Sequence, residues 1–213
     1  MRGHRLRVLL ADDHALVRAG TKEVLSRHFE ADFTETRDAP ETVDAACNQS
    51  PWDLILLDIS MPGRSGLDIL GDLKKCCPAT PILVLSAQDE EQFATRVLRA
   101  GAAGYLSKTN SPAELVRGVE RVLAGGRYVS EKFAESLARS VQKGTEPHSH
   151  ETLSAREFEV LRMIVAGRSG KEIGADLSIS FKTVSTYRTR LMQKLDVHSN
   201  AELARYAARE GLV

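Results

Sequence analysis

Four short apolar runs in the first half of the chain each end in polar residues suited to binding a phosphorylated carboxylate. The polar residues are Asp12, Asp13, Asp58, Ser86 and Lys108, and the runs before them are 7–11, 53–57, 81–85 and 104–106. Ligands of an open parallel sheet bind just beyond the carboxyl ends of its strands. We therefore expect these side chains to lie together, and the pattern indicates a switch driven by phosphorylation.

The chemistry expected of this cluster is phosphoryl transfer to a carboxylate. Asp58 follows an apolar strand and precedes a loop, which places it as a nucleophile toward a phosphoryl donor. Both reacting groups are anionic, so a counter-charge is needed, and Mg²⁺ supplies it at sites with one or two carboxylates and retained waters. The expected protein ligands are Asp13, Asp58 and the carbonyl of Ser60, with Asp12 acting through water or through its charge. Lys108 is expected to bind a phosphoryl oxygen as a point charge.

Two further residues are candidates for the part that moves. Ser86 offers a hydroxyl that can turn toward the new phosphoryl group, and Ala87 leaves room for it. Tyr105 would then move from an exposed to a buried position, which gives the two-state element that a switch requires. Taken singly, Tyr105 is more often plain packing, and an isolated Asp after a strand is usually a turn former. The joint occurrence favours the functional reading.

The elements that must position these residues alternate along residues 1–125. Five apolar runs of strand length, including a weaker one at 32–37, alternate with five segments of helical period. This alternation predicts a doubly wound α/β domain with a five-stranded parallel sheet. The expected helices cover residues 14–27, 42–48, 67–77, 90–100, after a cap at Asp89, and 112–124, after Ser111.

The pattern changes to helices alone in the second half. Residues 131–141 predict one helix, and the polar stretch 142–150 predicts a flexible connection. Four helices are expected after it, at 155–166, 170–177, 181–195 and 200–210. The predicted organisation is thus an α/β domain over residues 1–125, a linker with one helix over 126–150, and a small all-α domain over 151–213.

Helix, tight turn and helix over residues 167–195 suggest a DNA-binding element. Val184, Leu191 and Leu195 share the inward face of the second helix, which leaves small polar and basic side chains outward. Such a face suits a helix in the major groove, with hydroxyls near base edges and arginines on phosphates. By pattern alone, mere helical packing is about as frequent. The candidate DNA contacts are Lys182, Thr183, Ser185, Thr186, Tyr187, Arg188 and Arg190.

Composition and charge are those of an ordinary globular protein. Residues 1–125 carry a net charge of −3 and residues 126–213 a net charge of +3. Cys47, Cys76 and Cys77 show neither metal-ligand spacing nor a disulfide framework, so we expect unpaired packing residues in a reducing cytosol. The chain has no apolar run that could span a membrane and no signal peptide. The expected location is the cytoplasm, without membrane association.

Four motifs of the first domain resemble the receiver domain of two-component response regulators. They are Ala-Asp-Asp-His at 11–14, Leu-Asp-Ile-Ser-Met-Pro-Gly-Arg-Ser-Gly-Leu at 57–67, Leu-Ser-Ala at 85–87 and Gly-Tyr-Leu-Ser-Lys at 104–108. The resemblance covers residues 5–125 and implies a flavodoxin-like fold. It also implies that Asp58 accepts phosphate from a sensor histidine kinase and that Mg²⁺ is required.

The second domain is similar to the LuxR-type helix-turn-helix domain of the NarL/FixJ class over residues 152–210. The motifs are Leu-Ser-Ala-Arg-Glu at 153–157, Lys-Glu-Ile at 171–173 and Lys-Thr-Val at 182–184, and the stretch 183–190 is similar to the BvgA-like subgroup. The resemblance implies binding to double-stranded promoter DNA as a homodimer when phosphorylated, with RNA polymerase as a further candidate partner. It also implies a dimer contact on the last helix, through Leu203 and Tyr206; packing on the domain core is an equal alternative for Leu203.

Two rival hypotheses remain open at this point. An aspartate-nucleophile phosphatase of the haloacid dehalogenase type also uses a strand-end Asp, but that class needs a second Asp where this chain has Ser60. The other rival keeps both domains and drops the switch, so that dimer concentration alone sets DNA binding. We expect a phosphorylation-dependent transcription factor that is not an enzyme.

Overall fold

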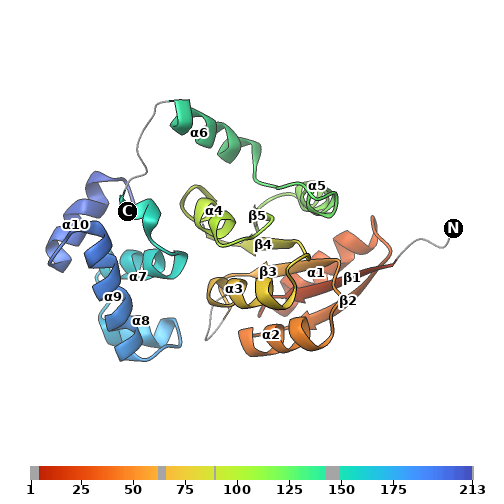
Figure 1. Ribbon diagram of the computed structural model, residues 1–213, viewed down its shortest axis with the longest axis horizontal. Helices are drawn as coiled ribbons and strands as arrows, with labels where there is room; N and C mark the ends of the chain where they lie inside the picture. The colour runs from red at the N-terminus through yellow and green to blue at the C-terminus, as the bar shows by residue number, and fades with distance from the viewer. Residues whose placement is uncertain (1–4, 62–65, 89, 143–148, 213) are drawn as a thin grey trace. The chain divides into compact units, whose positions relative to one another are not determined.

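The structure is a computed structural model that describes residues 5–61, 66–88, 90–142 and 149–212 (Figure 1). The chain divides into two compact units, residues 1–139 and residues 140–213. Each unit is described by itself.

A five-stranded parallel sheet forms the centre of the first unit. Its order is β2-β1-β3-β4-β5, with the chain crossing over after β2 (Figure 1). This order is that of the flavodoxin-like doubly wound fold, so the predicted fold class is confirmed. The strands are β1 (Leu6–Ala11), β2 (Ala31–Thr36), β3 (Leu54–Asp58), β4 (Ile82–Ser86) and β5 (Gly104–Ser107).

Helices on both faces of the sheet explain why its central strands read as unbroken apolar runs. Strand side chains alternate between faces. Leu10 and Leu56 pack with Leu25 of α1 and Val119 of α5 on one face. The alternate residues point to the opposite layer of α2, α3 and α4. The helices of this unit are α1 (Ala15–Ser26), α2 (Ala39–Asn48), α3 (Gly66–Cys76), α4 (Glu90–Arg99), α5 (Pro112–Leu123) and, continuing past residue 139, α6 (Glu131–Gln142).

Two N-caps set where helices begin. Ser111 accepts a hydrogen bond from the Glu114 N–H, with Pro112 in the first turn of α5, as predicted. Asp38 accepts one from the Glu41 N–H, so α2 begins at Ala39 and not at the predicted Thr42. The cap expected at Asp89 lies outside the described residues.

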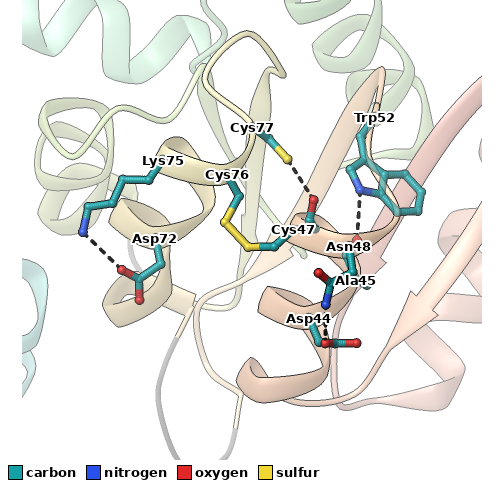
Figure 2. Close-up of a disulfide and its surroundings, with 10 residues drawn as sticks. Asp44, Ala45, Cys47, Asn48, Trp52, Asp72, Lys75, Cys76 and Cys77 are labelled. Atoms are coloured by element: carbon teal, nitrogen blue, oxygen red, sulfur yellow. Dashed lines mark hydrogen bonds and ion pairs between the residues drawn. A yellow bond between two sulfur atoms is a disulfide. The ribbon is translucent and has the colours of Figure 1, made fainter.

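The cysteines correct one prediction. Cys47, in the last turn of α2, forms a disulfide with Cys76, the last residue of α3 (Figure 2). The expectation that all three cysteines are unpaired is therefore wrong for these two. Cys77 alone is free, and its buried thiol donates to the Ala46 carbonyl at 3.2 Å. Sequence spacing missed the pair because only the packing of α2 against α3 brings these positions together.

The second unit is built of short helices that bury one apolar core. Ser154 and Glu157 form a capping box at the start of α7, and Ser169 and Glu172 form another at α8. Asp196 ends α9 in the left-handed conformation. The helices are α7 (Ala155–Val165), α8 (Gly170–Asp176), α9 (Phe181–Leu195) and α10 (Asn200–Arg209).

The last two residues of the predicted flexible connection, Ser149 and His150, belong to a 3-10 helix, η1 (Ser149–Thr152). The backbone N–H of His150 donates to the Tyr206 hydroxyl at 3.1 Å, and the imidazole contacts the same oxygen at the same distance. These contacts attach η1 to α10. The polar composition of residues 142–150 does not predict them, because the partner, Tyr206, is distant in the sequence.

Candidate functional site

Asp58 ends β3 at the carboxyl edge of the sheet, where it is only 1% exposed. One carboxylate oxygen, Oδ2, accepts a hydrogen bond from Lys108 Nζ at 2.7 Å. The other, Oδ1, accepts the backbone N–H of Ser60 at 2.9 Å. The loop after β5 thus brings Lys108 to the carboxylate, as the strand-end pattern predicts, and two donors fix the orientation of Asp58.

Three acids and one imidazole gather beside this pair. The ligand atoms of Asp12, Asp13, His14 and Asp58 lie within 4.8 Å of one another. Lys108 Nζ lies 2.7 Å from Asp12 Oδ2, and His14 Nδ1 lies 2.7 Å from Asp13 Oδ1. Among the described residues, however, neither of these two buried oxygens accepts a hydrogen bond of good geometry. Buried carboxylate oxygens without such a hydrogen bond are ligands that fit a hard divalent cation such as Mg²⁺.

Burial and charge act in opposite directions on the two central groups. Burial raises the pKa of Asp58 above its usual value, and the hydrogen bonds from Lys108 and Ser60 only partly offset this. Burial by itself would lower the pKa of Lys108, but its contacts with Asp12 and Asp58 outweigh burial and raise it. Lys108 therefore stays a cation, and additional positive charge at the site would favour the ionised form of Asp58.

A chain of hydrogen bonds runs from the pocket edge to Tyr105. The Gln88 N–H donates to Ser86 Oγ at 3.0 Å, and the Tyr105 hydroxyl donates to the Gln88 carbonyl at 2.7 Å. Tyr105 is 0% exposed, so the structure holds it in the buried position of the predicted exposed-to-buried exchange. Gln88 links the two predicted residues through its backbone, which its residue type does not reveal.

Two residues between α5 and α6 are hydrogen-bonded to elements next to Tyr105 and Gln88. Tyr128 pairs with β5 through its backbone, since its carbonyl accepts the Tyr105 N–H at 2.9 Å. The Ser130 N–H, just before α6, donates to Glu90 Oε1 at 2.8 Å. Glu90 begins α4, two residues after Gln88. The residue that precedes α6 is thus hydrogen-bonded to the helix that follows the Ser86–Gln88 segment.

Two residues that sequence reasoning missed shape the pocket. The guanidinium of Arg18 donates to the Asp12 carbonyl at 2.7 Å and to Glu35 at 2.9 Å, which fixes the turn after β1. Gly66 lies against the Asp58 carbonyl so closely that a β-carbon there would overlap it. Gly66 could be suspected from the sequence, because it is a glycine at the start of a helix that follows Asp58 closely. No comparable pattern in the sequence marks Arg18. The Ser60 carbonyl stays a predicted ligand.

The second helix of the helix-turn-helix, α9, presents the predicted two faces. Val184, Leu191 and Leu195 are at most 5% exposed and face the domain core. Lys182, Ser185, Thr186 and Arg190 are exposed, and Thr183, Tyr187 and Arg188 are half-buried. The Arg188 Nε donates to Asn200 Oδ1 at 3.0 Å, so its guanidinium is anchored to the start of α10.

The two predicted dimer residues of α10 are both buried within the domain. Leu203 is 0% exposed, which agrees with the alternative of packing on the core, and Tyr206 is 9% exposed and holds η1. The α10 dimer contact itself stays a prediction, and exposed neighbours such as Ala201 and Arg205 are the surface that it would use.

An acidic pocket at the carboxyl edge of a 2-1-3-4-5 sheet, paired with a strand-end lysine, defines a receiver domain, and the helices after it define a helix-turn-helix domain. Comparison with known proteins agrees on both. Residues 8–120 match the response regulator receiver domain, and residues 151–207 match the luxR family of bacterial regulatory proteins.

Relatives similar over nearly the whole chain include the response regulators UvrY and GacA. UvrY of Escherichia coli K12 is 36% identical over 97% of this chain and 95% of its own length. GacA of Pseudomonas viridiflava is 36% identical over 98% of each. A structure of RcsB from Salmonella enterica serovar Typhimurium, bound to a promoter with the phosphomimetic BeF3−, has a TM-score of 0.61 and 25% identity over 95% of this chain and 98% of that one.

The chain therefore belongs to the response regulators that join a receiver domain to a LuxR-type DNA-binding domain, and it is a two-component regulator of transcription. In the described part of the chain, none of the helices has the length and apolar character needed to cross a membrane.

Proposed function

We propose that Asp58 is the phosphoacceptor and that its donor is the phosphohistidine of a sensor kinase. A carboxylate oxygen of Asp58 attacks phosphorus, the bond from phosphorus to the histidine nitrogen breaks, and an acyl phosphate forms. The observation that carries this proposal is the 2.7 Å contact of Lys108 with the buried Asp58 carboxylate, beside two acids. Once the acyl phosphate has formed, the ammonium of Lys108 binds a phosphoryl oxygen in place of the carboxylate.

Asp12, Asp13 and Asp58 would hold Mg²⁺, with the Ser60 carbonyl as a further ligand. The cation supplies the positive charge that lets an anionic nucleophile approach an anionic donor. Asp12 and Asp13 each keep a buried oxygen without a hydrogen bond, which supports this assignment. The residues themselves orient the reacting carboxylate: Ser60 holds Oδ1 through its N–H, and Arg18 fixes the backbone carbonyl of Asp12.

The signal would leave the pocket through Ser86 and Tyr105. A phosphoryl group on Asp58 offers Ser86 Oγ a new partner in place of the Gln88 N–H. Movement of this segment would shift α4, whose Glu90 holds the start of α6 through Ser130. Phosphorylation would thus change the linker between the domains, which we assign to residues 126–150, between 1–125 and 151–213.

The output is sequence-specific binding to promoter DNA by a homodimer. The exposed hydroxyls of Ser185 and Thr186 would meet base edges, and Lys182, Arg188 and Arg190 would meet phosphates. Thr183 and Tyr187 lie along the flank of the same helix. A two-fold dimer reads two related half-sites, and α10 would carry its contact. RNA polymerase is a further partner expected of a promoter-bound regulator.

The protein is proposed to work in the cytoplasm as a regulator and not as an enzyme. The pocket has one nucleophilic acid and a lysine that stabilises its product, and Ser60 stands where a haloacid dehalogenase phosphatase needs its second Asp. The acyl phosphate would therefore persist as a signal until it is hydrolysed.

Selection of DNA from a random duplex library tests the proposal. Phosphorylated wild type should enrich a two-fold symmetric sequence, because two α9 helices read it at once. Asp58→Asn, treated with the same donor, should enrich it weakly or not at all. Equal enrichment and equal affinity for the variant would overturn the switch and favour a DNA binder controlled by dimer concentration alone.

A further inference from the structure

The disulfide between α2 and α3 lies outside the phosphoacceptor pocket and is not used by the function proposed above. Cys47 and Cys76 are both exposed, so the bond is accessible to a thiolate from solution. Exposed disulfides exchange with dithiols far more readily than buried ones. We propose that Cys47 and Cys76 form a reversible redox site that controls the mobility of α3.

A permanent structural role does not account for this bond. Small domains need disulfides when their core is too small, whereas this receiver buries complete layers on both faces of a five-stranded sheet. In the cytoplasmic location proposed above, lasting disulfides are rare, and those that form are mostly transient and redox-sensing. Exposure, a sufficient core and a reducing location together favour a bond that opens and closes.

The exchange is a two-electron reaction with a dithiol reductant. A thiolate of the reductant attacks the Sγ of one cysteine, the S–S bond breaks, and the other cysteine leaves as a thiolate and takes up a proton. The second thiol of the reductant then resolves the mixed disulfide. The chain gains two thiols, and the reductant leaves as a disulfide. The reverse reaction, with an oxidised dithiol, closes the bond again.

The third cysteine is kept out of this exchange. Cys77 is buried, and its Sγ donates to the carbonyl of Ala46, the residue before Cys47. Burial also raises the pKa of the Cys77 thiol, so it stays protonated and is a poor nucleophile. The neighbouring sulfur therefore does not scramble the Cys47–Cys76 pair.

The position of the bond allows its redox state to affect the phosphoacceptor pocket through α3. Cys76 ends α3, and Gly66 at its other end lies against the Asp58 carbonyl. Eleven residues of helix, about 16 Å long, join the two ends. The disulfide closes a sequence separation of 29 residues, so cutting it removes the covalent link between the carboxyl end of α3 and α2. In the reduced form this end of α3 is held by packing and by hydrogen bonds, such as that of Cys77 to Ala46.

Thiol counting on the full-length protein tests reversibility. In the oxidised form, alkylation after denaturation should label only Cys77, and after native treatment with dithiothreitol it should label all three cysteines. Oxidised dithiothreitol should restore the first result. Cys77→Ser is the matched control, with no labelled thiol when oxidised and two when reduced. A bond that dithiothreitol cuts only after unfolding, or that never forms, would overturn the proposal.

Amide hydrogen exchange tests the effect on α3. The buried residues Ile69 and Leu73 should exchange on the order of 10²-fold faster in the reduced form, as the loop-closure entropy of the cut bond implies. In Cys47→Ser the reductant should change nothing. Equal exchange in the two redox forms would overturn control of α3. Neither measurement depends on phosphorylation of Asp58, so failure here would leave the proposed function standing.

Discussion

Glu157 should make an unusually large contribution to the stability of the DNA-binding domain. Its side chain is 5% exposed, and Oε2 lies 2.7 Å from Lys194 Nζ on α9. The same oxygen accepts the Ser154 N–H at 2.8 Å, closing the capping box of α7. One carboxylate thus joins the start of α7 to α9, the helix expected to read DNA.

Glu157→Gln keeps the shape and one acceptor but removes the charge. A hydrogen bond to a charged group contributes about 1.5–3 kcal/mol. Since Lys194 is 41% exposed and remains solvated, we expect the lower part of this range, about 1.5–2 kcal/mol. Glu172→Gln is the matched control, because it alters the exposed capping box of α8, and its loss should be smaller.

Urea unfolding of the full chain measures the difference. Trp52, the single tryptophan, is buried in the receiver, so its fluorescence follows that domain alone. A circular dichroism transition without a fluorescence counterpart then belongs to the DNA-binding domain. With an m value of about 1 kcal/mol per M, the midpoint should fall by about 1.5–2 M in Glu157→Gln. Equal midpoints for Glu157→Gln and Glu172→Gln would refute the reasoning.

The same pair gives a pH dependence. Burial alone would raise the pKa of Glu157, but the hydrogen bonds from Lys194 and Ser154 outweigh it and hold the pKa below its usual value of 4.5. The stabilisation is therefore complete above pH 4.5 and is lost as pH falls through the lower pKa of the folded state. The gap between wild type and Glu157→Gln should be constant near neutrality and should close in acid; a gap that widens in acid would contradict the assignment.

Three further predictions concern the switch and its output. Lys108→Met should destabilise the receiver by about 3 kcal/mol, because it leaves buried carboxylates without their cation, and Mg²⁺ should restore more stability to this variant than to wild type in Trp52-detected unfolding; equal gains would contradict the metal site. Glu90→Ala should weaken the gain in DNA affinity on phosphorylation without changing phosphoryl uptake, whereas Glu91→Gln, which alters an exposed ion pair with Lys132, should behave as wild type in fluorescence anisotropy. Lys182→Ala should reduce the salt dependence of DNA binding by about one unit of slope without changing the selected sequence; a changed sequence would mean that Lys182 reads bases.

The sheet and the pocket could be predicted from sequence because short-range patterns determine them. A strand covered by helices on both faces reads as an unbroken apolar run, and its end is marked by the first polar residue. Parallel pairing brings the carboxyl ends of these strands, and with them Asp12, Asp58 and Lys108, to one edge of the sheet. The boundary of α2 was missed by three residues because Asp38 was not recognised as its cap.

Contacts between residues distant in the chain could not be predicted in this way. The Cys47–Cys76 bond depends on how α2 packs on α3, and two adjacent cysteines at 76 and 77 leave the partner undetermined in any reading of spacing. The position of η1 is fixed by the Tyr206 hydroxyl, and Tyr206 lies 56 residues from His150 in the sequence. Leu203 could not be assigned to a core or to a dimer surface, because an apolar residue on a helix suits both.

The measurement that tests the central claim most directly is the intact mass of the protein after treatment with acetyl phosphate, with and without Mg²⁺. Wild type should gain the mass of one phosphoryl group only when Mg²⁺ is present, and Asp58→Asn should gain none. An adduct that forms equally in Asp58→Asn, or a wild type that stays unmodified with Mg²⁺ and with a phosphorylated histidine kinase as donor, would contradict the assignment of Asp58 as the phosphoacceptor.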